Sequence, residues 1–225
     1  MKTTIVTLCY NKWNLTHQFL YDLYRREGDL IDKVIVIENA STDEEVRGGL
    51  NYWTNLWPKV SVAWQLVNLG FTIGANTGLK LACENAEKDH LVFLISNDVH
   101  ISGKFIHQAA DILLQEKKYF VGNKLLANDT GWNRFGDRIF PYLEGYFLAA
   151  TAHGWNEIGY FDENYAPYDF EDIDISTKAS SLGYRLTPLN NPAIVHLGGG
   201  TLGYNPEREK ITRRNQEYFK NKWTK

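Results

Sequence analysis

Short apolar runs alternate with longer amphipathic segments over the first hundred residues, and this alternation limits the fold more than any other feature. The apolar runs are rich in β-forming residues and predict strands at 4–10, 33–38, 60–65 and 91–95. Helices are predicted between them at 14–26, with Gly28 as the C-cap, and at 44–56 and 74–86. Such alternation indicates an α/β fold with a mostly parallel central sheet and helices on both faces.

The second half of the chain is less regular. It predicts helices at 104–115, 153–158 and 169–182, strands at 119–126, 145–151, 184–186 and 193–197, and a loop over 127–142. Ile211, Tyr218, Phe219 and Trp223 lie roughly on one face of an amphipathic helix that closes the chain. A length of 225 residues suits one well-filled domain, so we expect a single Rossmann-like domain over 1–225.

Charge and composition exclude several classes of protein. A net charge of −3 argues against a global nucleic-acid-binding surface. Cys9 and Cys83 lie in apolar segments and indicate no disulfide framework. The first ten residues do not resemble a signal peptide and no run of 18 apolar residues occurs, so we expect a cytoplasmic protein without a transmembrane segment. The basic segment 207–225 leaves peripheral membrane contact as an alternative.

Polar side chains follow each of the first four predicted strands. They are Asn11, Glu38, Asn39, Asn68, Asn97 and Asp98. Ligands of open parallel sheets bind beyond the carboxyl ends of the strands, so this shared position predicts one binding site. The alternative for any one of these residues is that Asn and Asp favour turns.

Two acidic features predict a metal ion and a general base. Residues 157–174 contain seven acidic side chains and no Lys or Arg, and Asp98 directly follows a buried apolar run. The spacing of Asp169 and Asp172 also suits a helix N-cap, which is the structural alternative for Asp169. On a helix Glu171 and Asp174 share a face while Asp172 points elsewhere, as expected if the acids have different roles.

Four segments, in order along the chain, resemble those of the GT-A glycosyltransferases, and in particular the inverting family 2. They are Val34-Ile-Val-Ile-Glu-Asn-Ala-Ser-Thr-Asp43, Asn68-Leu-Gly-Phe-Thr-Ile-Gly-Ala-Asn-Thr-Gly78, Ser96-Asn-Asp-Val99, and the block from Gly159 to Asp174 with its Phe-Glu-Asp-Ile-Asp ending. The blocks are similar to those of a rhamnosyltransferase-like subgroup. The resemblance covers almost the whole chain and implies a GT-A-like fold, with nucleotide-sugar binding in 1–100 and acceptor binding in 101–225.

The resemblance implies a role for each candidate residue. Asp98 and His196 are implied to hold a divalent cation, Mn²⁺ or Mg²⁺, although Ser96 replaces the first acid of the usual motif. The resemblance implies a UDP-, dTDP- or GDP-sugar donor, which would contact Glu38, Asn39, Asn68, Gly70, Asn76 and Asn97. Asn11 is added to this set because it follows the first predicted strand. His196 is expected to precede a flexible glycine loop.

The reaction implied is transfer of a sugar, rhamnose or a related hexose, to a hydroxyl of a glycan or lipid-linked acceptor with inversion. Asp172 is implied to be the general base and Glu171 to position the acceptor, with the reverse assignment as runner-up. Arg213 is a candidate for a donor or lipid phosphate, and the alternative is a solvated basic face. The aromatic residues of the second half suit either sugar stacking or the core; they are Trp132, Tyr142, Tyr146, Trp155 and Tyr168.

Two other classes of function share some of these features. A nucleotidyltransferase has a similar sheet and metal requirement, but residues 10–14 lack the glycine- and arginine-rich loop that such enzymes usually carry after the first strand. A binding module that has lost turnover is suggested by the single carboxylate at 96–98.

Overall fold

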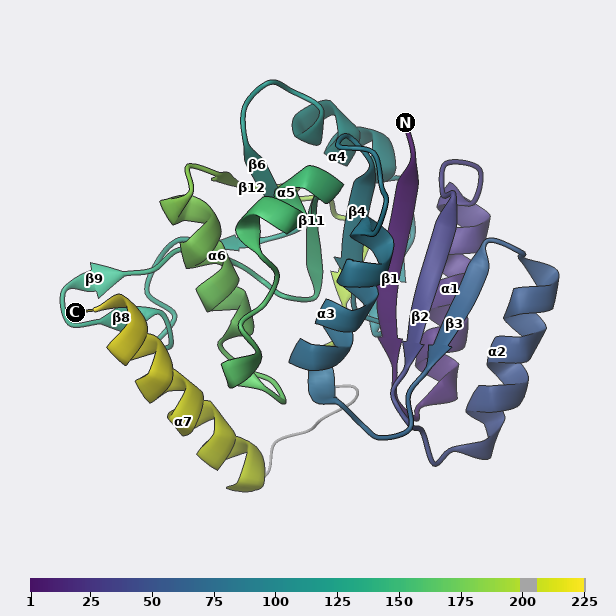
Figure 1. Ribbon diagram of the computed structural model, residues 1–225, viewed down its shortest axis with the longest axis horizontal. Helices are drawn as coiled ribbons and strands as arrows, with labels where there is room; N and C mark the ends of the chain where they lie inside the picture. Colours follow the sequence, from purple (N-terminus) through teal and green to yellow (C-terminus); the bar gives the residue numbers. More distant parts are fainter. Residues whose placement is uncertain (199–205, 225) are drawn as a thin grey trace.

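A twisted seven-stranded sheet forms the centre of the molecule in the computed structural model, which describes residues 1–198 and 206–224 (Figure 1). Its strands are β1 (Thr3–Cys9), β2 (Lys33–Glu38), β3 (Val60–Trp64), β4 (Leu91–Ile95), β6 (Tyr119–Gly122), β11 (Phe147–Thr151) and β12 (Arg185–Pro188). Their order is β12-β6-β11-β4-β1-β2-β3. The pairs β1–β2, β1–β4, β2–β3 and β6–β12 are parallel, whereas β11 is antiparallel to β4 and β6.

Helices cover both faces of this sheet because its strands are apolar on both sides. Val34 and Val36 of β2 face one layer, and Ile35 and Ile37 face the other, as the alternation of a strand requires. The first layer holds α1 (Trp13–Glu27), α2 (Glu44–Leu56) and α4 (Ile106–Leu113). The second holds α3 (Gly70–Cys83), α5 (Ala152–Ile158) and α6 (Glu171–Ser181). The predicted fold class is confirmed.

A smaller apolar cluster joins the C-terminal helix α7 (Pro206–Trp223) to the second half of the chain. Phe219 is fully buried in this cluster, and its ring centroid lies 5.1 Å from the ring centroids of Phe135 and Phe140. In Figure 1, α7 lies beside α6 and far from α2. The short elements around it are β7 (Leu125–Leu126), β8 (Arg134–Phe135), β9 (Arg138–Ile139), β10 (Tyr142–Leu143) and the 3₁₀ helix η1 (Glu163–Tyr165).

Several predicted boundaries were wrong, mostly in the second half. Helix α3 begins at Gly70, not at residue 74, and ends at Cys83. The predicted strand 119–126 is two strands, β6 and β7, and the predicted loop 127–142 contains the hairpin β8–β9 and the start of β10. Gly28 follows α1 as expected but keeps a right-handed conformation, with φ −54°. Among the described helices, none is long and apolar enough to span a membrane.

Candidate active site

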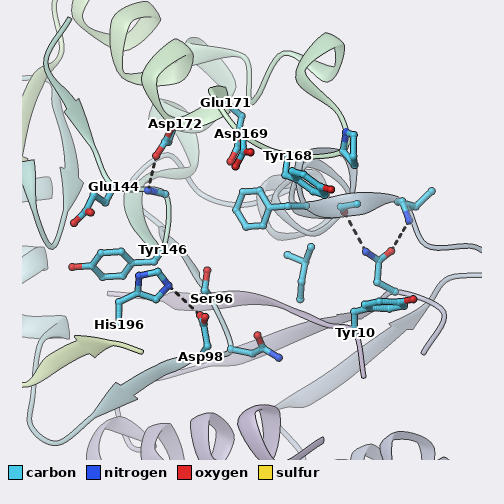
Figure 2. A pocket seen from close by; sticks show the side chains of 18 of the residues that line it. Tyr10, Ser96, Asp98, Glu144, Tyr146, Tyr168, Asp169, Glu171, Asp172 and His196 are labelled. Atoms are coloured by element: carbon cyan, nitrogen blue, oxygen red, sulfur yellow. Dashed lines mark hydrogen bonds and ion pairs between the residues drawn. The ribbon is translucent and has the colours of Figure 1, made fainter. Parts of the chain in front are cut away.

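A cavity of about 720 Å³ lies beyond the carboxyl ends of β1, β2 and β4, where open α/β sheets bind their ligands. Figure 2 shows acidic side chains from the start of α6 on one side of it and the pair Asp98–His196 on the other. The side chains that line it and concern the chemistry are Tyr10, Asn39, Asn68, Asn97, Asp98, Glu144, Tyr146, Tyr168, Asp169, Glu171, Asp172, His196 and Arg208. Residues that are 74 positions apart, Asp98 and Asp172, therefore face one space.

Asp98 and His196 are brought together by a two-stranded ladder. Strand β5 (Val99–Ile101) pairs with β13 (Ile194–His196) in an antiparallel register that sets His196 opposite Val99. The Nε2 atom of His196 then lies 3.3 Å from Oδ1 of Asp98, whose side chain is 9% exposed. The glycine loop expected after His196 falls largely on 199–205, outside the described residues.

This pair fits a divalent cation as part of a larger ligand set. No three His, Cys, Asp or Glu side chains converge as a metal site in 1–198 and 206–224. One carboxylate and one imidazole suit Mn²⁺, and oxygens of a diphosphate and water are ligands that would complete its coordination. When bound, such a cation would neutralise charge on a departing diphosphate.

Asp172 is held as an acceptor by two backbone N–H groups. The amide of Gly145 donates to Oδ2 at 3.2 Å, and the amide of Ile173 donates to Oδ1 at 2.8 Å. Burial raises the pKa of Asp172 to about 6 against the lowering effect of these two hydrogen bonds, and the charges of Asp169 and Glu144 add to the rise. A pKa of about 6 makes the carboxylate more basic than an ordinary aspartate and leaves it mostly deprotonated at neutral pH, which suits a general base.

Glu171 differs from its neighbour in both burial and partners. Its side chain lines the cavity but is 8% exposed, and among the described residues its Oε2 atom has no hydrogen-bond partner. Burial raises the pKa of Glu171 well above its usual range, and the charge of Asp172 adds to this rise. Burial therefore favours the protonated form of Glu171.

Asp169 is not a helix N-cap, so the structural alternative for this residue does not hold. Phe170 takes the N-cap position of α6, with φ 75°, and gives no side-chain cap. Asp169 instead accepts two hydrogen bonds from Arg208 of α7, at 2.9 and 3.2 Å, and one from Thr212 at 2.6 Å. This bidentate pair fixes α7 at the cavity wall.

Asn39 organises the turn before α3. Its Nδ2 donates to Oδ1 of Asn68 at 2.9 Å and to the carbonyl of Gly70 at 3.2 Å, while its Oδ1 accepts from Leu69 N. Gly70 needs its glycine because φ is +72° and a Cβ atom would lie 2.5 Å from Pro167. The predicted positions 39, 68 and 70 thus form one wall of the cavity.

Four predicted binding residues do not line the cavity. Asn11 accepts from the amides of Thr42 and Asp43 and fixes that loop. Glu38 accepts from Ser41 N, at 2.7 Å. Asn76 is buried and joins α3 to the backbone of Phe161. Arg213 points to Glu209 at 2.6 Å, with its side chain 75% exposed.

The sequence reasoning missed Tyr10, Glu144 and Arg208, all of which line the cavity. The predicted first strand, 4–10, included Tyr10, whereas β1 ends at Cys9, so Tyr10 lies at the carboxyl end of the strand where ligands bind. Of the aromatic candidates, Tyr142, Tyr146 and Tyr168 line the cavity, whereas Trp155 is fully buried in the core and Trp132 is 47% exposed outside it.

Comparison with known proteins identifies the family. The profile described as Glycosyl transferase family 2 matches residues 4–177, which is most of the chain and includes Asp98, Glu171 and Asp172. The chain belongs to glycosyl transferase family 2. The part beyond the match, 178–225, contains His196, Arg208 and α7. No curated protein matches this family 2 chain in sequence.

Solved structures share the fold of this family 2 chain at low identity. A mannosyltransferase from Pyrobaculum calidifontis in complex with GDP-Man and Mn²⁺ has TM-score 0.62 and 18% identity over 83% of this chain and 54% of its own. GalNAc-T7 with UDP, GalNAc and Mn²⁺ has TM-score 0.72 and 12% identity over 96% and 48%. S. aureus TarS 1-349 with UDP-GlcNAc has TM-score 0.63 and 16% identity over 98% and 67%. The chain thus spans about half the length of the first two.

Proposed function

We propose that this protein is an inverting glycosyltransferase that moves a sugar from a nucleotide diphosphate donor to a hydroxyl of a glycan or lipid-linked acceptor. The observation that carries the proposal is that Asp172, with its raised pKa, and the Asp98–His196 pair line one cavity of about 720 Å³. Family membership and the nucleotide and Mn²⁺ complexes of similar folds support it. A UDP- or dTDP-sugar, with rhamnose or a related hexose, is our leading choice of donor.

Asp172 acts as the base in this proposal. The acceptor oxygen bonds to the anomeric carbon on the face opposite the diphosphate, the bond from that carbon to the diphosphate oxygen breaks, and the hydroxyl proton passes to Asp172. Asn39, Asn68 and Gly70 form the wall proposed to hold the nucleotide, with Asn97 beside Asp98. The proposed role of Glu171 is to position the acceptor. Arg208 lines the cavity and Arg213 does not, which supports Arg208 as the arginine that meets an anionic group of either substrate.

The test is a screen of UDP-, dTDP- and GDP-sugars for slow hydrolysis in Mn²⁺, Mg²⁺ or chelator. We expect one donor class to be cleaved in a metal-dependent manner, and Asp98→Ala to lower the rate by roughly 10²-fold or more. A thermal melt of the variant controls for folding. A protein that binds a nucleotide sugar but cleaves none, even with an array of simple sugar acceptors, would be a binding module instead.

The rate is expected to fall at acid pH. Because the base must be deprotonated and the pKa of Asp172 is raised to about 6, kcat/KM should decline roughly tenfold per pH unit below that value. The Glu144 carboxylate raises the pKa of Asp172, so Glu144→Gln should move the acid limb of the pH–rate profile, where kcat/KM falls, to lower pH. A limb that moves to higher pH, or a rate independent of pH between 5 and 8, would contradict the assignment.

A further inference from the structure

Tyr146 stacks against His196 at the edge of the cavity. The two ring centroids are 4.5 Å apart and the ring planes differ by 17°, so the imidazole lies flat on the phenol ring. His196 is the last residue of the three-residue strand β13. The residues on either side of it, Val195 and Leu197, are 46% and 60% exposed. Tyr146 therefore supplies the packing that the exposed neighbours of His196 do not.

The Tyr146 ring is itself fixed by buried contacts. It is 9% exposed, and its hydroxyl accepts a hydrogen bond from Nδ2 of Asn123 at 3.2 Å. The same Nδ2 donates to the carbonyl of Ile194 at 3.2 Å, two residues before His196. The carbonyl of Tyr146 accepts from Ser96 N at 2.9 Å, two residues before Asp98. Tyr146 thus connects the two segments that carry Asp98 and His196.

The stack and the contact with Asp98 constrain His196 in different ways. The Asp98 contact uses the ring nitrogen Nε2, whereas the stack uses the face of the ring and leaves both ring nitrogens free. A metal-binding imidazole is held in orientation by outer partners, and such partners must leave the nitrogen that binds the metal free. The stack meets that requirement.

We infer that Tyr146 is a positioning residue that sets the imidazole of His196 for a divalent cation shared with Asp98. The inference rests on the proposed function, because that function supplies the cation. Because the contact with His196 is made by the ring of Tyr146, the inference predicts that this ring matters more for Mn²⁺ binding than the Tyr146 hydroxyl does.

The test measures Mn²⁺ affinity by electron paramagnetic resonance of free Mn²⁺, in the presence of UDP, dTDP or GDP, with no turnover involved. Tyr146→Leu removes the stack and is expected to weaken Mn²⁺ binding by about 10-fold, whereas Tyr146→Phe keeps the ring and should stay within about twofold of wild type. His196→Ala gives the value without the imidazole.

Tyr184→Leu is a matched control for the loss of a buried tyrosine. Tyr184 is 7% exposed, donates one hydrogen bond to Glu157 and lies outside the cavity. Tyr184→Leu should leave the Mn²⁺ affinity unchanged even if it lowers the melting temperature of the protein. Wild-type affinity in Tyr146→Leu, or an equal loss in Tyr184→Leu, would overturn the inference. Absence of nucleotide-dependent Mn²⁺ binding in the wild type would contradict the proposed function itself, and this inference with it.

Discussion

Asp172→Asn is expected to lower kcat by about 10²- to 10⁴-fold, because the amide cannot accept the proton of the attacking hydroxyl. The amide oxygen can still accept from one of the two backbone N–H groups that hold Asp172, so the fold and the donor affinity should remain close to wild type. Single-turnover kinetics with the donor found by the screen would measure the chemical step, and nucleotide titration would measure binding.

Glu171→Gln is the matched control, and it distinguishes the two candidate bases. Since burial and the charge of Asp172 raise the pKa of Glu171 and so favour its protonated form, the neutral glutamine resembles that form. We expect kcat to change by less than about tenfold and the acceptor KM to carry most of the effect. If Glu171→Gln lost more activity than Asp172→Asn, the roles of the two residues would be reversed.

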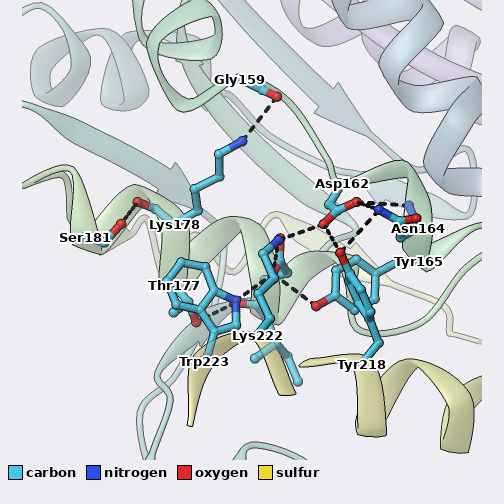
Figure 3. A network of polar contacts seen from close by, with 12 residues as sticks. Gly159, Asp162, Asn164, Tyr165, Thr177, Lys178, Ser181, Tyr218, Lys222 and Trp223 are labelled. Carbon is cyan, nitrogen blue, oxygen red and sulfur yellow. Dashed lines mark hydrogen bonds and ion pairs between the residues drawn. The ribbon is translucent and has the colours of Figure 1, made fainter. Parts of the chain in front are cut away.

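Lys222→Met is expected to cost about 3 kcal/mol of the free energy of unfolding. Figure 3 shows the network at the end of α7, in which Lys222 points towards Asp162. The Nζ atom of Lys222 lies 2.8 Å from Asp162 and 2.9 Å from Asp174. The Asp174 side chain is 1% exposed, so loss of the cation would leave a buried carboxylate with Tyr165 and Trp223 as its remaining described hydrogen-bond donors. Urea denaturation of the wild type and the variant measures this difference in the free energy of unfolding.

Two further variants isolate the cause of this loss. The double variant Lys222→Met with Asp174→Asn removes both charges and should recover most of the stability, because an uncompensated buried charge is the expensive element. Lys220→Met, on the same helix, breaks an exposed pair with Glu217 at 4.0 Å and should change stability by less than about 1 kcal/mol. If the double variant were as unstable as Lys222→Met, lost packing and not charge would be the reason.

The first half of the fold could be predicted because its local and global signals agree. The predicted bounds of β2, α2 and β4 coincide with the observed ones, since each is an unbroken apolar or amphipathic run between clear turns. Helix α3 starts at Gly70 and not at the predicted residue 74, and this start was missed because glycine is a poor helix former and gives no signal for a helix start. The two-residue strands of the second half depend on tertiary contacts and give no periodic signal.

The candidate site was predicted in part for the same reason. Strand ends and family motifs pointed to Asp98, His196, Glu171 and Asp172, which line one cavity. The direction in which each side chain points was harder to predict from the sequence. Arg208 and Arg213 are five residues apart, about 140° around a helix, so that Arg208 reaches the cavity and Arg213 does not. Asn11, Glu38 and Asn76 follow the right strands or motifs but fix backbone segments instead.

The most direct test of the proposed site is calorimetric titration of UDP, dTDP and GDP into the wild-type protein and Asp98→Asn, each with Mn²⁺ and with chelator. We predict that at least one nucleotide binds the wild type in Mn²⁺, that chelator weakens this binding strongly, and that Asp98→Asn binds weakly in both conditions. Binding of no nucleotide, or binding of equal strength with chelator and without Asp98, would contradict a metal-assisted nucleotide-sugar site in this cavity.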